Sequence, residues 1–264
     1  MRSPAPVVPS GLRGDNGPSS DAGRVMSIKT LDEFLAHTGE RDLVDAPFEL
    51  ESERMLEARV DGMVWAKAGA MIARKGQIRF TRQGLLEQGL GTLFKKAISG
   101  EGMHLMRIEG RGRVYLADAG KKITLLRLQG EPIFINGNDV LAFESSIGSE
   151  IRMLRRAAGM LSGGLFNVRL DGHGLVAITS HYDPLTLPVS AATGPVFTDP
   201  NATVAWSGGL LPELVLDVSL KTFVGRGSGE SLQLKFQGEG WVVVQPYEEV
   251  AFQHRPRGGG GWSG

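Results

Sequence analysis

The sequence predicts an all-β fold, a sandwich or closed barrel with short helical inserts. Many short runs alternate apolar and polar residues, closely spaced glycines separate these runs, and one unit of the pattern recurs along the chain. Alternation with a period of two places one face of a strand in a core and the other in solvent. A parallel α/β sheet would instead require long helices between its strands.

The recurring unit is centred on a pair of glycines separated by one residue. It occurs in MRIEGRGRVYLAD, VRLDGHGLVAITS and LKFQGEGWVVVQP, at Gly110 and Gly112, Gly172 and Gly174, and Gly238 and Gly240. A basic residue precedes each pair by three positions, namely Arg107, Arg169 and Lys235. A second repeat relates residues 132–147 to residues 195–210, with Pro, Phe, Asn and Ala in register. The chain is therefore expected to use one unit about three times.

Each glycine pair lies between two strand-like runs, which predicts a β-hairpin whose glycines adopt positive φ. The alternative is a phosphate-binding loop, which requires a helix directly after the glycines. No such helix pattern follows, and the third glycine of a dinucleotide fingerprint is missing. The expected strands cover residues 48–52, 55–60, 63–67, 77–81, 103–109, 113–118, 122–128, 133–136, 140–143, 165–170, 174–179, 186–189, 203–206, 214–220, 231–236 and 240–245.

Three segments have a helical pattern. A cap at Ser27 or Thr30, followed by apolar residues on one face, predicts a short helix or turn near residue 31. Residues 84–99 and 149–161 are expected to be helical inserts. In the second insert the apolar residues share one face and the arginines lie elsewhere, which favours packing or assembly over membrane binding.

Composition limits the domain plan. Residues 1–25 and 253–264 are rich in Pro, Gly and Ser and are predicted to be an N-terminal disordered tail and a flexible C-terminal tail. A single repeated β-sandwich domain is expected over residues 26–252. The chain has no cysteine, which fits a reducing cytoplasm, and no apolar run approaches the roughly 20 residues that cross a bilayer. A cytoplasmic protein without a transmembrane segment is therefore expected.

The order and spacing of four stretches resemble the altered-inheritance-of-mitochondria protein 24 family. The stretches are VWAKAGAMIARKGQIRF, SGEGMHLMRIEGRGRVYLAD, VAWSGGL and GSGESLQLKFQGEGWVVVQP, and the resemblance covers residues 48–246. It implies a double-stranded β-helix sandwich of the kind seen in the tryptophan RNA-binding attenuation protein, and a homo-oligomer, most often a trimer. The family has no catalytic residue to carry over.

No residues are assigned as catalytic, cofactor-binding or metal-binding. The histidines are His37, His104, His173, His181 and His254. His173 lies between two glycines, where the parallel copies have Arg111 and Glu239, which favours a solvated residue over a ligand. The serine of WSGGL lacks the surrounding pattern of a nucleophile elbow. The chain is therefore expected not to be an enzyme and to need no cofactor.

The residues favour a non-enzymatic scaffold or interaction protein, and the resemblance implies that it is a homo-oligomer, with itself as partner. The alternative is a nucleic-acid or anionic-surface binding module. Equal numbers of basic and acidic residues, 29 each, argue against a dedicated nucleic-acid binder, but local basic clusters leave the alternative open. These clusters are Arg111 with Arg113, Lys95 with Lys96, Lys121 with Lys122, and Arg152 with Arg155 and Arg156.

Overall fold

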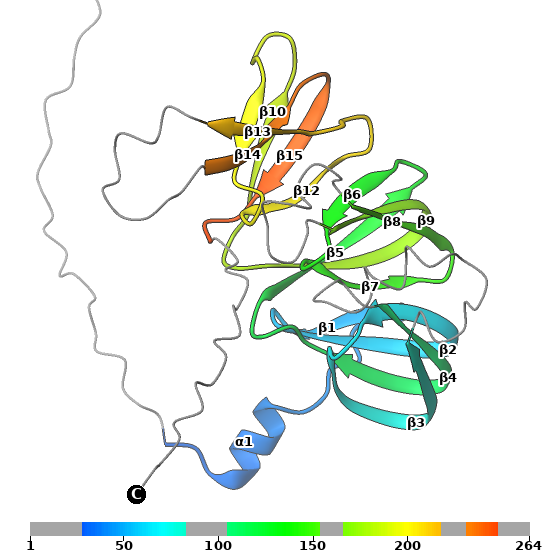
Figure 1. The fold of residues 1–264 in the computed structure, drawn as a ribbon. Coiled ribbons are helices and arrows are strands. Elements are labelled where there is room, and N and C mark those ends of the chain that lie inside the picture. Colours follow the sequence, from blue (N-terminus) through cyan, green and yellow to red (C-terminus); the bar gives the residue numbers. More distant parts are fainter. Residues whose placement is uncertain (1–27, 83–104, 154–165, 218–230, 248–264) are drawn as a thin grey trace, which may run out of the picture. The chain divides into compact units, whose positions relative to one another are not determined.

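The computed structural model describes residues 28–82, 105–153, 166–217 and 231–247, drawn as ribbons in Figure 1. The helix α1 (Leu31–His37) belongs to a first compact unit, which ends at Glu40. The Thr30 side chain accepts a hydrogen bond from the Glu33 N–H, and the Glu33 carboxylate accepts one from the Thr30 N–H. This reciprocal capping box begins the helix where the sequence predicted it.

The unit from Arg41 onward is built almost entirely from antiparallel strands, which confirms the predicted all-β class. The first strands are β1 (Phe48–Ser52), β2 (Met55–Lys67), β3 (Met71–Arg82) and β4 (Leu105–Leu116). The next are β5 (Lys122–Gln129), β6 (Ile133–Asn136), β7 (Val140–Glu144), β8 (Ile147–Met153) and β9 (Phe166–Ser180). The last are β10 (Leu185–Val189), β11 (Val196–Thr198), β12 (Thr203–Ser207), β13 (Glu213–Asp217), β14 (Ser231–Phe236) and β15 (Gly240–Val244).

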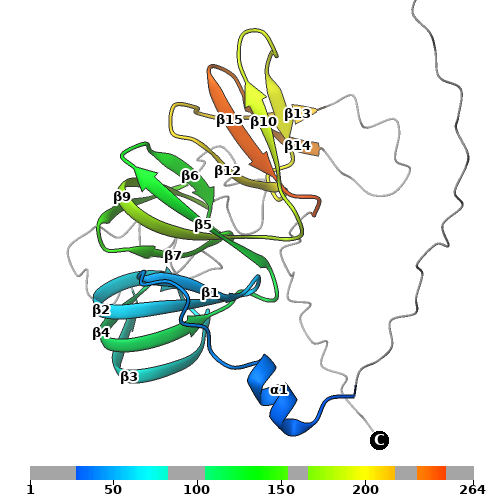
Figure 2. The ribbon, with the colours of Figure 1, turned by 180° about the vertical axis from the view of Figure 1, so that it is seen from behind.

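Twelve of these strands form one sheet, whose main path is β10-β15-β12-β6-β9-β7-β2-β4-β3. β1 pairs with β2, and β5 and β8 pair with β9, outside this path. A second sheet has the order β11-β14-β13. Figure 1 and its reverse view in Figure 2 show β2, β4 and β3 side by side in one curved layer.

The core consists of three hydrophobic clusters, whose residues alternate along the chain. The first is built mainly on β2 and β4 and includes Leu56 and Ile108, both fully buried. The second is built on β6, β7 and β9. In the third, the Trp206 ring stacks on Phe134 at a centroid distance of 5.4 Å and meets the edge of Phe236 at 5.5 Å.

The structure differs from the predicted fold mainly at the glycine pairs. Gly110 and Gly112 lie inside β4, and Gly172 and Gly174 lie inside β9, so the hairpin turns predicted at these two pairs are wrong. In the third copy, Gly238 does separate two strands, β14 and β15. In all three copies a strand follows the pair, so the geometry of a phosphate loop is absent there.

The glycines are instead places where a long strand bends against its neighbours. Gly110 has a φ of 126° and Gly172 a φ of 117°, which agrees with the predicted positive φ. A Cβ atom on Gly110 would overlap the carbonyl oxygen of Gln77 on β3, and one on Gly172 would lie 2.8 Å from the Ser146 carbonyl oxygen. Glycine is thus required both by the backbone angles and by close backbone approach.

The second predicted helical insert is wrong in its first part. Residues Ser149–Met153 belong to strand β8 and pair residue by residue with β9. The rest of this insert, the insert at 84–99 and the two tails lie outside the described residues. The double-stranded β-helix arrangement and the single domain over 26–252 stay predictions.

Candidate interaction surface

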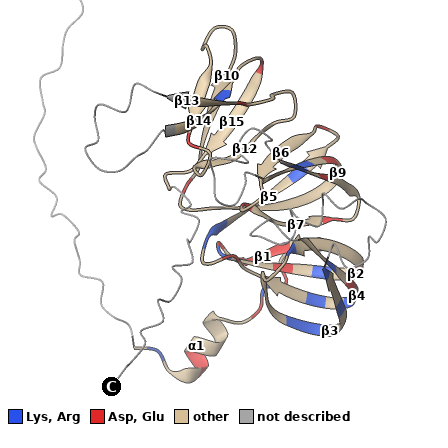
Figure 3. Cartoon of the chain, in the orientation of Figure 1, with Lys and Arg blue, Asp and Glu red and all other residues tan. Residues whose placement is uncertain are grey.

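The main surface feature is β3, of which the sequence predicted only residues 77–81 as a strand. It pairs with β4 along one edge, and no described strand pairs with its other edge. Apart from buried Ile78 and the half-buried Phe80 and Thr81, its residues are exposed. The strand contains four cations, Arg74, Lys75, Arg79 and Arg82, and no acidic residue, which Figure 3 shows as blue segments.

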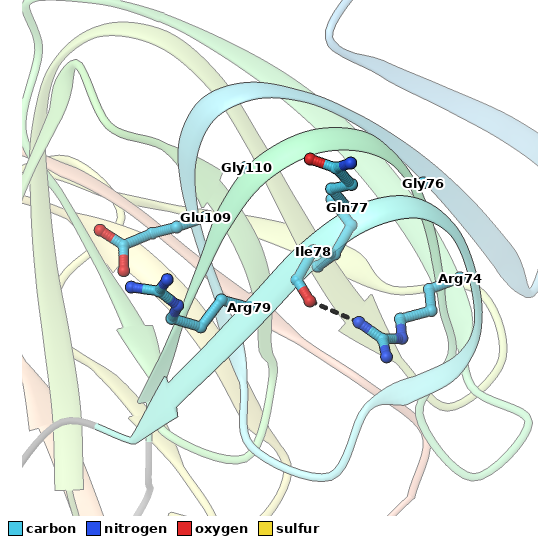
Figure 4. Close-up of a pocket in the computed structure, with 7 residues that line it drawn as sticks. All are labelled: Arg74, Gly76, Gln77, Ile78, Arg79, Glu109 and Gly110. Carbon is cyan, nitrogen blue, oxygen red and sulfur yellow. Dashed lines mark hydrogen bonds between the residues drawn. The ribbon is translucent and has the colours of Figure 1, made fainter.

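A hollow of about 640 Å³ lies against this strand where β3 and β4 bend together. Figure 4 shows its lining residues, with Arg74 on one side of Ile78 and Arg79 with Glu109 on the other. The Arg74 guanidinium donates a hydrogen bond to the Ile78 carbonyl oxygen and lies over the Phe80 ring, 5.7 Å from its centroid. These contacts hold one cation in place at the free edge of the sheet.

The basic clusters predicted from the sequence are largely neutralised. Arg111 pairs with Asp61, Arg113 with Asp42 and Glu57, Lys121 with Asp139, Lys122 with Asp183 and Glu53, and Arg152 with Glu150. Lys95, Lys96, Arg155 and Arg156 lie outside the described residues. By contrast, Arg79 and Arg82 on β3 form no ion pair within the part of the chain that the structure describes.

A group of three carboxylates, Asp42, Glu49 and Glu57, could offer oxygen ligands to a metal ion. Two guanidinium groups already occupy it: Arg59 lies 2.7 Å from Glu49 and 2.9 Å from Glu57, and Arg113 lies 2.8 Å from Asp42. Hydrogen bonding to Glu57 raises the pKa of Arg59, and hydrogen bonding to Asp42 raises the pKa of Arg113. The group is better explained as a buried charge network that fixes Asp42 against β1, β2 and β4.

A second buried network joins the ends of several strands. The Lys121 ammonium lies 2.9 Å from Asp139 Oδ1, and the Lys67 ammonium lies 2.9 Å from Asp118 Oδ2. Thr179 Oγ1 donates to Asp118 at 3.3 Å. Asp139 is 1% exposed, and its Oδ2 has no hydrogen-bond partner within the described residues. Burial therefore raises the pKa of Asp139 to about 6, although Lys121 opposes the shift.

This carboxyl gives a testable dependence of stability on pH. The pKa of Asp139 is raised from 3.8 to about 6 in the fold, so protonation of this carboxyl favours the folded state. This stabilisation of the fold is fully present below about pH 3.8 and is lost as the pH rises through 6. We expect the unfolding free energy of the parent, relative to Asp139→Asn, to fall by about 2–3 kcal/mol between pH 4 and pH 7. Urea denaturation at several pH values measures it.

The matched control is Asp183→Asn, because the Asp183 side chain is 86% exposed beside Lys122. This variant reports what the Asp-to-Asn change itself does to stability at an exposed position. A parent-to-Asp139→Asn difference that stays constant with pH would contradict the raised pKa.

The described histidines do not form a site. His37 ends α1, and His173 is exposed at the bend of β9, as expected for a solvated residue. His181 follows the end of β9, and its ring centroid lies 3.9 Å from that of Tyr247. Burial lowers the pKa of His181. His104 and His254 lie outside the described residues.

With the fold and these clusters defined, comparison with known families identifies the chain. The sequence model of the family described as mitochondrial biogenesis AIM24 matches residues 48–247. The chain belongs to the AIM24 family. This agrees with the resemblance inferred from the glycine-centred repeats and relates the chain, by the family's description, to mitochondrial biogenesis.

A solved structure supports the fold of this AIM24 member. An X-ray structure of a protein from Streptococcus pyogenes matches with a TM-score of 0.59 and 22% identity, covering 76% of this chain and 92% of the other. At this identity the similarity establishes the fold alone. A search of curated proteins finds no match. No described helix is long and apolar enough to cross a membrane.

Proposed function

We propose that this AIM24-family chain is a non-enzymatic homo-oligomeric scaffold or interaction protein. The observation that carries the proposal is the free edge of β3. Within the described residues no strand covers this edge, and an exposed edge presents N–H and C=O groups that can pair with another chain, although Arg74 already binds the Ile78 carbonyl oxygen there. Met71 and Ile72, which are 39% and 52% exposed, add apolar surface at the start of this strand. A trimer is the assembly that the family resemblance implies.

The buried charged groups are bound to other residues of the chain, which supports a non-enzymatic role. Glu57 is fully buried and accepts hydrogen bonds from Arg59, Arg113 and Tyr115. Lys121 is bound to Asp139 and to the Asn138 carbonyl oxygen. Groups held in this way join strands and loops to one another. Catalytic groups must instead have room for a substrate within hydrogen-bond reach.

The four cations of β3 support a second candidate function. This is binding to a polyanion such as nucleic acid or an anionic surface. Against it, the described members of the other basic clusters are bound to carboxylates. RNA binding by stacking also requires exposed aromatic rings beside the cations. Phe80, the aromatic residue of β3, is half-buried under Arg74. Self-association is therefore favoured.

Native mass spectrometry of the full chain tests the proposal. We expect an oligomer, with the mass of three chains, and elution from heparin resin at low salt because few phosphate contacts would form. A monomer over the micromolar range would contradict the scaffold. Firm retention on heparin that falls steeply with rising salt would favour the polyanion candidate.

A further inference from the structure

The turn between β9 and β10 holds a tyrosine in a strained and exposed conformation. Tyr182 has a φ of 60°, a left-handed conformation that is rare for a bulky side chain. It is 64% exposed, and its side chain forms no hydrogen bond or ring contact within the part of the chain that the structure describes. Backbone strain of this kind is concentrated at functional sites, so the exposed ring of Tyr182 needs an explanation beyond packing.

Neighbouring groups impose this conformation on the turn. The His181 N–H donates to Gln245 Oε1 at 2.7 Å, and the Ser180 hydroxyl donates to the Tyr182 carbonyl oxygen at 3.1 Å. The centroid of the His181 ring lies 3.9 Å from that of Tyr247. The backbone is therefore held on both sides of Tyr182 before any partner binds, which lowers the entropy cost of covering the turn.

More apolar surface is exposed around Tyr182. Leu185 is 59% exposed and Tyr247 is 42% exposed. The acidic side chain of the turn, Asp183, is 86% exposed beside Lys122. Tyrosine is one of the residues that most often anchor a protein interface. The turn therefore presents aromatic and apolar surface with a carboxylate at its side.

The hollow beside β3 has the complementary chemistry. Its volume of about 640 Å³ is ample for one aromatic side chain, and Arg74 and Arg79 flank Ile78 in its wall (Figure 4). Arg79 forms no ion pair within the described residues. The acidic residue of the wall, Glu109, is bound by Arg107, so the lining is cationic. Guanidinium groups stack on tyrosine rings and bind carboxylates, and the turn exposes both groups.

We propose that the Tyr182 turn of one copy inserts into the hollow beside β3 of a second copy. This inference rests on the proposed homo-oligomer and assigns one of its contacts. The Tyr182 ring lies against the Arg79 guanidinium, and Asp183 faces the cationic lining. Tyr182 does not line the hollow of its own chain, so the contact joins two copies. Because the two surfaces differ, repetition gives a closed ring or an open chain.

A double-mutant cycle tests the contact. The variants are Tyr182→Asn, Arg79→Gln and the two changes combined. Each single change should raise the dissociation constant for assembly by ~10-fold or more, because it removes one side of the aromatic–guanidinium contact. The combined variant should be about as weak as the weaker single variant, because the two groups act on each other. Analytical ultracentrifugation measures the three constants.

Stability separates binding by Tyr182 from a role in the fold. Asparagine adopts the left-handed conformation readily, so Tyr182→Asn should melt at the parent's temperature or above it. Melting well below the parent would show that the ring supports the fold, and would overturn the argument from strain. The matched controls are Phe197→Thr, at a ring that is 50% exposed on β11, and Arg111→Gln, at a side chain that is 84% exposed. Both controls should keep the dissociation constant of the parent.

Cross-linking tests the same contact without removing its residues. The chain has no cysteine, so introduced thiols react alone. One variant carries Pro184→Cys, at an exposed position in the turn, and the other carries Gln77→Cys, at the hollow. A short bismaleimide should join the two variants into covalent dimers when they are mixed. Neither variant alone should form them.

The outcomes separate this contact from the proposed function. A monomeric parent overturns both, and heparin retention that depends on Arg79 would then assign the hollow to a polyanion. An oligomeric parent overturns the contact alone if either single variant keeps the parent's dissociation constant, if the two effects simply add, or if the mixture does not cross-link. Coupled losses together with cross-linking of the mixture support the contact.

Discussion

Replacing Gly110 by alanine is expected to lower the unfolding free energy by about 4 kcal/mol or more, among the largest effects of a single change. Two costs add at this position. The φ of 126° is strained for any residue with a Cβ atom, and the new methyl group would overlap the Gln77 carbonyl oxygen on the neighbouring strand. Chemical denaturation of the parent and the variant measures the loss.

Gly62 provides the matched control for this prediction. It lies opposite Gly110 in the register of β2 and β4 and has a φ of 113°, but a Cβ atom there would meet nothing within 4 Å. Gly62→Ala should therefore cost only the conformational strain, about 1–3 kcal/mol. Equal losses at the two positions would show that the close approach to Gln77 contributes nothing.

The second large effect is expected at Glu57. Glu57→Gln removes the buried negative charge that Arg59 and Arg113 share, at 2.9 Å and 3.2 Å. Breaking a buried ion pair on one side leaves an uncompensated charge, but both arginines are partly exposed, so water offsets some of the penalty. We expect a loss of about 2–4 kcal/mol, measured by urea denaturation at pH 7.

The exposed pair of Asp61 and Arg111 is the comparison for Glu57. Their side chains are 79% and 84% exposed, and surface ion pairs contribute at most about 1 kcal/mol. Asp61→Asn should thus change stability by a few tenths of a kcal/mol. A loss at Glu57 no larger than that at Asp61 would contradict the assigned role of the buried network.

Many of the strands were predictable because the alternation of apolar and polar residues along a short segment already shows which side chains will be buried. The expected strands at 48–52, 133–136 and 231–236 coincide with β1, β6 and β14. The turns at the glycine pairs were wrong because positive φ suits a bend within a strand as well as a hairpin, and the sequence does not distinguish them. β8 was missed because its apolar spacing also fits a helix, and pairing with β9 overrides that local preference.

The surface features depend on contacts that the sequence does not show. Glu49 and Glu57 lie on the side of their strands that the alternation predicts to face solvent. Both are nevertheless buried, because Asp42 and its neighbours lie against them. The β3 strand was predicted only over 77–81, which separated Arg79 from Arg74 and Lys75. Its free edge is a property of strand order, and strand order comes from tertiary pairing.

β9 has a consequence for synthesis on the ribosome. One half of this strand pairs with β6 and β8, and the other half pairs with β5 and β7. Leu175 and Ala177 also complete the first hydrophobic cluster, which otherwise comes from residues 48–142. The emerging chain therefore cannot close its N-terminal core until β9 has left the exit tunnel. Until then, the apolar strands made early stay uncovered, and such exposed apolar surface is prone to aggregation.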